Sequence, residues 1–462
     1  MIGQWTLADV ANAIGAELPS SAAFLPCEGV YTDSRAAAEG RVFLALVGER
    51  FDAHDFIDQA IEQGAIAVIV SRPVDVSVPV LQVENTLIAL GAVGKANRSR
   101  FTGKVVAVTG SSGKTTVKEM AAAILATQGK TLYTQGNLNN EIGAPQTLMR
   151  LDETHHFGVI ELGASGGGEI ARTVAMTKPH VSILNNAAGA HLEGFGSLMG
   201  VVKAKGEIID GVLPGGKAVL NADDPHVDIW VERAAENGKG VILFGESERA
   251  DVRFSEAEVD ALGLWRAQMI LPDGEKLCFK LSIPGRHNLA NATAAAAACW
   301  QLGVPAKAIA QGLSEVKAVK GRCFPIQSPA GLRIIDDSYN ANPSSMTAAV
   351  LMLSAMPGPH VLALGSMAEL GSGTVSGHQQ VGEAAAKADI DWLFCCGPHG
   401  LHYVEGFIAA GGDAERALYF PQKADLVVAL QQKVENTMVV LCKGSRSAGM
   451  EDVVNALAGG VN

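Results

Sequence analysis

Short apolar runs alternate along the chain with longer stretches in which apolar residues recur at helical spacing. Within residues 1–100, the runs at 42–46, 66–70 and 78–83 have the β-branched composition typical of strands. The block ends at 95–100 in Lys-Ala-Asn-Arg-Ser-Arg, whose basic and polar composition predicts a linker. The pattern therefore predicts a first α/β domain over residues 1–100.

The alternation becomes regular from residue 101, because each apolar run is followed by a helical pattern. The runs lie at 105–109, 157–161, 181–184, 218–220 and 241–244. This order predicts a parallel sheet with helices on both faces, and ligands bind such sheets beyond the carboxyl ends of the strands. Two further runs, 264–271 and 276–283, flank Pro272-Asp273-Gly274-Glu275 and predict an antiparallel hairpin added to the sheet. We expect this second domain to cover residues 101–315.

A third block repeats the strand-then-helix order. Its strand-like runs lie at 332–336, 361–365, 392–395, 417–420 and 438–442. This period predicts a second doubly wound, Rossmann-like domain over 316–462. No G-x-G-x-x-G follows its first strand, so a dinucleotide role is weakly supported.

The strand at 105–109 runs directly into a glycine-rich turn and a helical pattern, Gly110-Ser111-Ser112-Gly113-Lys114-Thr115-Thr116. Glycines let backbone N–H groups approach phosphate oxygens, Lys114 supplies a charge for the β- and γ-phosphates, and the Thr115 hydroxyl suits Mg²⁺. The usual spacing is G-x-x-x-x-G-K-[ST], and here Val108 stands at the first glycine position. A plain glycine turn is the other interpretation, but the flanking strand and helix favour a shortened phosphate-binding loop for ATP. The expected fold is therefore α/β in three domains, with a central P-loop parallel-sheet ATPase domain and a C-terminal Rossmann-like domain.

Composition narrows the possible partners. The 462 residues carry a net charge of −12, and the basic residues are scattered, which argues against nucleic acid and anionic membranes. The seven cysteines are odd in number and lack C-x-x-C spacing, so we expect buried thiols in a reducing compartment. No signal-peptide pattern begins the chain, and no uncharged stretch approaches the ~18 residues of a membrane span. A cytoplasmic protein is expected.

Polar residues follow the strands of the middle block. Glu161 closes the 157–161 run, where a carboxylate can hold Mg²⁺ or orient water, although it could instead cap a turn. Asn185 and Asn186 end the next run, and His191 follows them. A lone histidine is more often structural than a ligand, but its position beyond a strand end favours a site.

Amides, acids and cations gather further along the chain. Asn288 and Asn291 stand three apart at the start of a helix predicted over 288–302, so both can face an adenine edge; Asn288 could equally be an N-cap. The adjacent acids Asp336 and Asp337 at a strand end suggest a ribose or metal contact. The segment 443–446, Lys-Gly-Ser-Arg, offers cations at another strand end.

Together these motifs resemble the Mur ligase family, and the resemblance spans nearly the whole chain. The stretches that carry it are 109–116, 136–140, 161–164, 185–196, 203–208, 221–224, 337–343 and 443–447. The phosphate-binding loop and Asn221-Ala222-Asp223-Asp224 belong to the wider family. The stretches Ala-His-Leu-Glu-Gly-Phe-Gly, Lys-Ala-Lys-Gly-Glu-Ile, Tyr-Asn-Ala-Asn-Pro and Lys-Gly-Ser-Arg look like the branch that adds D-Ala-D-Ala.

The resemblance implies an ATP-dependent, ADP-forming ligase that joins D-Ala-D-Ala to UDP-N-acetylmuramoyl-tripeptide through an acyl phosphate, in peptidoglycan biosynthesis. It further implies an N-terminal domain for the UDP-sugar, a central ATPase domain, and a mobile C-terminal domain that closes over ATP. A monomer is expected. A glutamate-adding or tripeptide-forming ligase is the nearest rival within the family; a P-loop switch and a nicotinamide dehydrogenase are the rivals outside it.

The resemblance also assigns residues. The nucleotide would meet Gly110, Ser111, Ser112, Gly113, Lys114, Thr115, Thr116, Asn288, Asn291, Arg322 and Asp337. Metal ligation would fall to Thr115, Glu161, His191 and Lys205, and catalysis to Lys114, Lys205 and His191. The substrates would meet Ser34, Arg35, Asn139, Asn140, Asn340, Asn342, Lys443, Ser445 and Arg446. In this family a lysine after the histidine loop is often carbamylated, and the register favours Lys205 over Lys203. Ser34 and Arg35 also have a plain interpretation as part of a capped turn.

Overall fold

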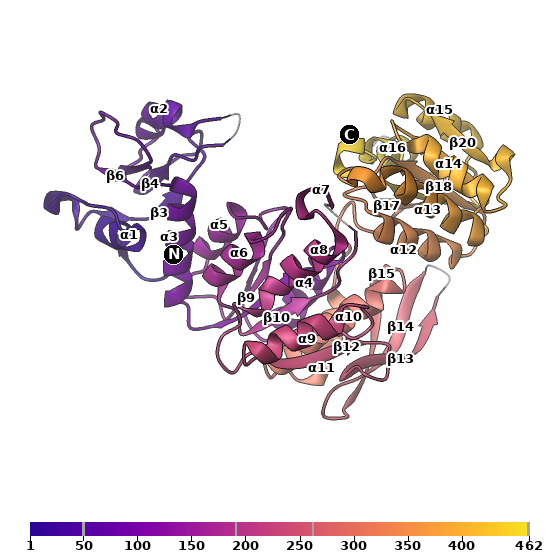
Figure 1. The fold of residues 1–462 in the computed structure, drawn as a ribbon, viewed down its shortest axis with the longest axis horizontal. Coiled ribbons are helices and arrows are strands. Elements are labelled where there is room, and N and C mark those ends of the chain that lie inside the picture. Colours follow the sequence, from indigo (N-terminus) through magenta and orange to yellow (C-terminus); the bar gives the residue numbers. More distant parts are fainter. Residues whose placement is uncertain (49–50, 190–191, 261–262, 460–462) are drawn as a thin grey trace.

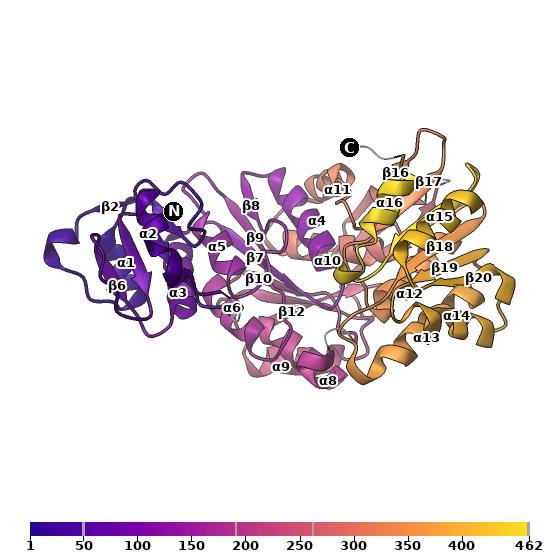
Figure 2. The same ribbon diagram turned by 90° about the horizontal axis from the view of Figure 1, so that it is seen from above.

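Three large sheets and one separate two-stranded sheet follow one another along the chain in this computed structural model, which describes residues 1–48, 51–189, 192–260 and 263–459. Figure 1 shows the three α/β bodies side by side along the long axis, with the N-terminal body at one end and the C-terminal body at the other, and Figure 2 gives the same order from above. The fold is therefore α/β and built on parallel sheets, as expected.

The N-terminal sheet is small and wholly parallel. Its strands, in spatial order, are β3 (Gly29–Tyr31), β4 (Arg41–Leu44), β5 (Ala67–Val70) and β6 (Val80–Gln82). The pair β1 (Trp5–Thr6) and β2 (Pro26–Cys27) lies beside α1 (Leu7–Ile14), while α2 (Ile57–Glu62) and α3 (Thr86–Arg100) complete the body. Apolar side chains pack on both faces of the sheet, as its β-branched runs require.

The central sheet has nine strands, and the phosphate-binding loop follows β7, the third strand from the β8 edge. The order is β15 (Lys276–Pro284), β14 (Leu264–Ile270), β13 (Val252–Val259), β12 (Gly240–Gly245), β11 (Lys217–Asn221), β10 (Val181–Leu184), β7 (Lys104–Thr109), β9 (Phe157–Glu161) and β8 (Thr131–Tyr133). Helices α4 (Lys114–Ala126), α10 (His287–Gln301) and α11 (Ala306–Glu315) cover one face. The other face packs against α5 (Gly143–Met149), α6 (Glu169–Thr177), α8 (Leu198–Gly206) and α9 (Val227–Glu236), with α7 (Leu192–Phe195) beside α8. The predicted hairpin is confirmed as β14 and β15.

The C-terminal sheet has five parallel strands and one antiparallel edge strand. The order is β16 (Phe324–Gln327), β17 (Arg333–Asp337), β21 (Val439–Lys443), β18 (His360–Gly365), β19 (Trp392–Cys396) and β20 (Ala417–Phe420). One face carries α12 (Pro343–Ser354), α13 (Thr374–Lys387) and α14 (Gly400–Ala409), and the other carries α15 (Lys423–Lys433) and α16 (Glu451–Leu457). Helices on both faces confirm the predicted doubly wound arrangement.

Two sequence predictions are wrong. The basic segment 95–100 is not a linker but the last turns of α3, and its polar residues Asn97 and Arg98 are buried because they bond to the central body. The cysteines are all free, but Cys278 is exposed on β15 while the other six are buried. No helix among the described residues is both long and apolar enough to cross a membrane.

Candidate active site

A cavity of about 570 Å³ lies where the carboxyl ends of the central strands face the C-terminal body. Both sheets contribute, since the wall includes the loop after β7, the end of β9, the start of α10, the loop after β17 and the last residue of β21. Residues from well-separated segments thus share one polar space. The predicted residues along its wall are Ser111, Ser112, Gly113, Lys114, Thr115, Thr116, Asn139, Asn140, Glu161, Asn288, Asn291, Arg322, Asp337, Asn340, Asn342 and Lys443.

The loop before α4 has the backbone of an anion site. Gly113 has φ +76°, and a Cβ there would lie 2.5 Å from the Asn185 Nδ2 atom and 2.6 Å from the Asn291 Oδ1 atom, so only glycine fits. The Ser111 and Ser112 amides donate to Asn186, at 3.0 and 2.9 Å. No side chain caps α4, which leaves its first N–H groups for a ligand. The N–H groups at the start of α4 are therefore better placed to bind phosphate than those of Ser111 and Ser112, which are already paired.

Two cations from different bodies meet near this loop. The Lys114 Nζ atom donates to the Gly110 carbonyl at 2.8 Å. Burial lowers the pKa of Lys114; the Glu161 carboxylate opposes that shift, and the charge of Arg322 adds to it. Because Lys114 and Arg322 repel one another, an anion bound between them would be favoured. The residues present therefore fit a polyphosphate.

Glu161 lies beside the phosphate-binding loop with both carboxylate oxygens engaged. The Thr115 hydroxyl donates to Oε2 at 2.9 Å, and the Asn139 amide donates to Oε1 at 2.8 Å. The described residues hold no group of three acid, histidine or cysteine side chains that could bind a metal alone. Mg²⁺ is commonly held by one or two carboxylates together with substrate phosphates, so this carboxylate–hydroxyl pair fits that ion. His191, the other predicted metal ligand, lies outside the described residues.

Lys205 is almost fully buried, with 2% of its surface exposed. Its Nζ atom lies 3.4 Å from the Ala164 carbonyl and 5.2 Å from the centre of the Phe195 ring. Burial lowers the pKa of Lys205 to about 7; the charge of Lys114 acts in the same direction, while Glu169 and Glu207 oppose it. The amine is therefore partly neutral near pH 7. Lys203, by contrast, is exposed.

The two amides proposed for adenine form a buried chain of hydrogen bonds. Asn185 donates to Asn291 at 2.9 Å, Asn291 donates to Asn288 at 2.9 Å, and Asn288 donates to the Pro284 carbonyl at 2.7 Å. The N-cap interpretation of Asn288 is wrong, because α10 begins at His287 and Arg286 is the residue before it. The chain holds both amides in fixed orientations at the cavity wall.

In the C-terminal body, Asp337 and Lys443 form a buried ion pair of 2.6 Å. Lys443 also donates to the Asn340 carbonyl at 2.9 Å, and the Cys323 N–H donates to Asp337 at 3.1 Å. Asp336 has a different role from the predicted ribose or metal contact. It is fully buried, and its carboxylate accepts from the Gly321 N–H at 3.0 Å and the Ser338 N–H at 3.1 Å, so it holds two chain segments together.

Several predicted substrate residues have local partners. Asn342 caps α12 by accepting from the Ser345 N–H at 2.9 Å, although it still lines the cavity. Ser445 is buried and donates to the Ser366 carbonyl at 2.8 Å, while Arg446 is exposed and pairs with Glu451 at 3.0 Å. The cavity wall includes neither Ser445 nor Arg446.

Ser34 and Arg35 lie in the N-terminal body, away from this cavity. Ser34 donates to Gln59 at 3.1 Å, and the exposed Arg35 pairs with Asp33 at 2.8 Å, as a capped turn would. Next to them, Gln146 of the central body donates to the Thr32 hydroxyl at 2.9 Å. A ligand that touched both Ser34 and the cavity would have to extend across the two bodies.

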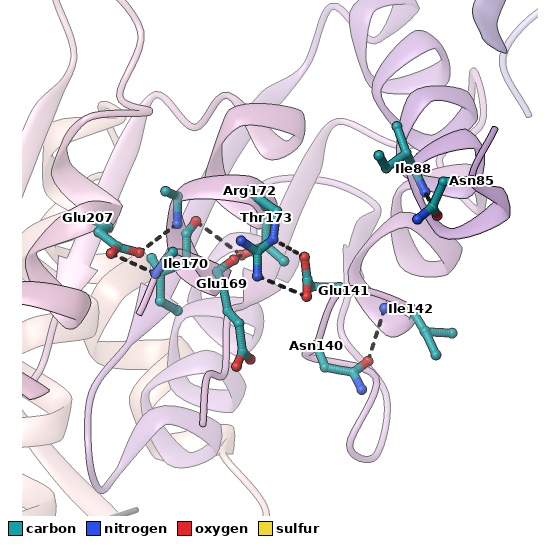
Figure 3. Close-up of polar contacts among 12 residues, drawn as sticks. Asn85, Ile88, Asn140, Glu141, Ile142, Glu169, Ile170, Arg172, Thr173 and Glu207 are labelled. Carbon is teal, nitrogen blue, oxygen red and sulfur yellow. Dashed lines mark hydrogen bonds and ion pairs between the residues drawn. The ribbon is translucent and has the colours of Figure 1, made fainter. Parts of the chain in front are cut away.

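Helix α6 contributes Glu169 to the cavity wall, and Figure 3 shows the polar contacts around this helix. Glu207 accepts from the Gly168 and Ala171 N–H groups, both at 2.9 Å, and so caps the start of α6. One turn later, Arg172 pairs with Glu141, the residue after Asn140 (Figure 3). Sequence reasoning missed this cap, because Glu207 lies far along the chain from the helix that it caps.

Two further cavity residues, His287 and Tyr339, carried no role in the sequence analysis. Burial lowers the pKa of His287, whose Nε2 atom lies 3.9 Å from the Cys323 sulfur. The Tyr339 ring lies against the guanidinium of Arg322. The signal available in the sequence was their position, because His287 adjoins Asn288, assigned to the nucleotide, and Tyr339 adjoins Asn340, assigned to the substrates.

These features define a nucleotide-dependent α/β enzyme whose site is split between two parallel-sheet bodies. The chain belongs to the Mur ligase family. Family models match at 26–124 (Mur ligase family, catalytic domain), 108–299 (Mur ligase middle domain) and 321–446 (Mur ligase, glutamate ligase domain).

Relatives and solved structures match over nearly the full chain. The UDP-N-acetylmuramoyl-tripeptide–D-alanyl-D-alanine ligase of Escherichia coli is 45% identical, with 98% of each chain covered, and that of Haemophilus influenzae is 40% identical, with 93% of each covered. A crystal structure of MurF from Acinetobacter baumannii has a TM-score of 0.91 at 36% identity, covering 99% of both chains. MurF from Thermotoga maritima, solved in complex with ADP, has a TM-score of 0.84 at 29% identity, covering 93% of this chain and 97% of that one.

Proposed function

We propose that this chain is the ligase that joins D-Ala-D-Ala to UDP-N-acetylmuramoyl-tripeptide, with ATP converted to ADP and phosphate. The observation that carries the proposal is the meeting of Lys114, Glu161 and Arg322 in one cavity between two sheets. Support comes from the full-length similarity to ligases of that name and from a related structure solved with ADP. Neither a P-loop switch nor a nicotinamide dehydrogenase has comparable support.

The nucleotide would lie between the central and C-terminal bodies. Its phosphates would meet the free N–H groups at the start of α4, together with Lys114 and Arg322, and its base would meet Asn288 and Asn291. Mg²⁺, which would spread the charge of the transferred phosphoryl group, would be held by Thr115 and Glu161. The working division of the chain is 1–100 for the UDP-sugar, 101–315 for ATP and 316–462 for closure over both.

The reaction needs an activated carboxylate, because a free carboxylate is a poor acyl donor. The tripeptide carboxylate would attack the γ-phosphate to give an acyl phosphate and ADP, while Lys114 stabilises the charge that develops on the phosphoryl oxygens. The amine of D-Ala-D-Ala would then attack the acyl carbon, and phosphate would leave. Closure of the C-terminal body would keep water away from the acyl phosphate.

Lys205 would support the metal as a carbamate. A neutral amine forms an N–C bond to carbon dioxide and loses one proton, which converts the neutral side chain into an anionic one. The buried position and lowered pKa of Lys205 favour the neutral amine that this step needs, whereas exposed Lys203 lacks that environment. We therefore assign the carbamate to Lys205. His191 remains a proposed metal ligand, beside Thr115, Glu161 and Lys205.

A phosphate-release assay tests the function directly. The purified chain should release phosphate from ATP only when both UDP-N-acetylmuramoyl-tripeptide and D-Ala-D-Ala are present, and the product should be the UDP-muramoyl-pentapeptide. Single amino acids, glutamate included, serve as controls for the related activities of the family. Equal turnover with a single amino acid in place of the dipeptide would contradict the proposal. We place the enzyme in the cytoplasm, because ATP and a UDP-linked tripeptide are among its proposed substrates, and we expect a monomer.

A further inference from the structure

Tyr339 lies between two arginines from different segments of the C-terminal body. The guanidinium carbon of Arg322 is 4.3 Å from the centre of the Tyr339 ring, and that of Arg446 is 5.7 Å from it. Both distances fall within the ~6 Å over which a ring face attracts a cation. One aromatic side chain therefore contacts a proposed nucleotide residue and a proposed substrate residue at once.

Backbone hydrogen bonds hold the chain segment that carries the ring. The Tyr339 N–H donates to the Gly321 carbonyl at 3.0 Å, and Gly321 in turn donates to the buried Asp336 carboxylate. Gly321 has φ +81°, and a Cβ there would lie 3.2 Å from the Tyr339 Cβ. The next carbonyl, that of Asn340, accepts from Lys443 at 2.9 Å. The loops that carry Arg322 and Arg446 are thus fastened to the segment that carries the ring.

A ring is a different kind of partner from a carboxylate. A carboxylate would occupy the N–H donors of a guanidinium and neutralise its charge, whereas a ring face leaves all five donors for another ligand. Arg322 lies at the cavity wall and close enough to Lys114 to lower its pKa, so its donors are near the proposed phosphates. Arg446 donates from Nη1 to the Glu451 carboxylate at 3.0 Å, and its other N–H donors suit the free carboxylate of the dipeptide.

We propose that Tyr339 is a positioning residue that holds Arg322 toward the nucleotide phosphates and Arg446 toward the carboxylate of the incoming dipeptide. This inference rests on the proposed function. It predicts that ATP and D-Ala-D-Ala depend on the same ring, although they bind to different arginines. The UDP-sugar does not depend on it, because its proposed residues Ser34 and Arg35 lie in another body.

The test compares Tyr339→Phe, which keeps the ring, with Tyr339→Leu, which removes it. Tyr339→Leu should raise KM for both ATP and D-Ala-D-Ala about five- to tenfold, the size expected for the loss of a partly desolvated cation–π contact. KM for UDP-N-acetylmuramoyl-tripeptide should stay within about twofold, and Tyr339→Phe should stay within about twofold for all three substrates. Tyr419→Leu, another half-buried tyrosine of the same body on the edge strand β20, is the matched control and should leave all three KM values unchanged.

Three outcomes would overturn the inference: a rise in KM for only one of the two substrates, an equal rise for all three, or a Tyr339→Phe variant as impaired as Tyr339→Leu. Titration with ADP adds a measurement that needs no turnover, and Tyr339→Leu should weaken ADP binding by a similar factor. If the wild-type chain binds ADP in this ring-dependent way but does not ligate, the proposed function and the dipeptide half of the inference fail, while the nucleotide half is supported.

Discussion

The two junctions between the bodies are built in opposite ways. At the first, α3 runs without a break from the N-terminal body into the central one, and the buried Arg98 donates to the carbonyls of Thr177 and Lys178, both at 2.8 Å. At the second, residues 316–323 contain no helix or strand, and the cavity is lined by residues of both bodies. The first junction would lose buried hydrogen bonds if it moved; the second has fewer to lose.

This difference indicates where motion belongs in the molecule. A buried carbonyl that loses its donor costs about 1–3 kcal/mol, so the α3 junction resists bending. The second junction is bridged by the contact between Cys323 and His287 and by Met352 and Met356, which pack toward Gly285 and Gly263. Because methionine side chains adapt to changes in shape, this contact can be remade after a rotation. We therefore expect the N-terminal and central bodies to move as one.

The largest expected effect comes from breaking the first junction. Asn97 accepts from the Ile2 N–H and donates to the carbonyls of Leu148 and Leu151, so Asn97→Ala should destabilise the protein by about 3 kcal/mol. Chemical denaturation measures the change. Ser99→Ala, an exposed position on the same helix, should change stability by less than about 0.5 kcal/mol. Equal stability of the two variants would mean that Asn97 does not secure the junction.

The next effect compares the two halves of the nucleotide site. Lys114→Ala should lower kcat at least about 10²-fold, since it removes a group that stabilises the transferred phosphoryl charge, while the fold remains intact. Arg322→Ala, on the moving side, should raise KM for ATP more than it lowers kcat. Steady-state kinetics on folded variants measure both. Near-normal turnover of Lys114→Ala would rule out the phosphate-binding loop.

A pH-dependent effect is expected from Lys205. With its pKa lowered to about 7, the amine is mostly protonated at pH 6 and mostly neutral at pH 8, so the carbamate forms more readily at pH 8. Activity lost on removal of carbon dioxide should return with bicarbonate more completely at pH 8 than at pH 6. Lys205→Ala should lose activity that bicarbonate does not restore but that short carboxylic acids restore in part. Full activity of Lys205→Ala would contradict the assignment.

The smallest effect concerns the second junction itself. Gly321→Ala forces a side chain into positive φ and against Tyr339, and should destabilise the protein by about 1–2 kcal/mol. Gly411→Ala is the matched control, because Gly411 has φ +92° and a Cβ added there would have no atom within 4 Å, so this variant should show the backbone strain alone. A thermal unfolding series separates the two. Identical losses would show that contact with Tyr339 adds nothing.

The sequence predicted the regular parts of this molecule and missed the parts set by long-range contacts. The strands of the phosphate-binding region and the hairpin follow from periodicity alone, whereas β3 and β8 have only three residues each and β16 contains Pro325, which is typical of an edge strand. The basic composition of the 95–100 segment is typical of a linker. The carbonyls that accept hydrogen bonds from the buried Arg98 lie about 80 residues further along the chain, so local composition could not reveal them. In each of these segments, contacts with residues distant in the sequence determine the structure.

The same limit applies to the site. Spacing and resemblance pointed to Lys114, Glu161 and the two amides, and all of them line the cavity. Adjacent residues of a strand face opposite sides, so only one of the two neighbouring acids can line the cavity. Spacing could not tell which one: Asp336 is a structural carboxylate and Asp337 is the cavity residue. Nor could it find the contact between Tyr339 and the two arginines, which joins three loops.

The most direct test is a pair of distance measurements across the two junctions, made after Cys278, the exposed cysteine, is replaced. Spin labels would be placed at Glu62 and Glu232 for the first junction and at Glu232 and Lys387 for the second, all of which are exposed. ATP with UDP-N-acetylmuramoyl-tripeptide should shorten the Glu232–Lys387 distance and leave the Glu62–Glu232 distance unchanged, because bound ligands shift populations only through contacts that differ between the two states. An unchanged Glu232–Lys387 distance with saturating ligands, or a change confined to Glu62–Glu232, would contradict the assignment of motion to the second junction.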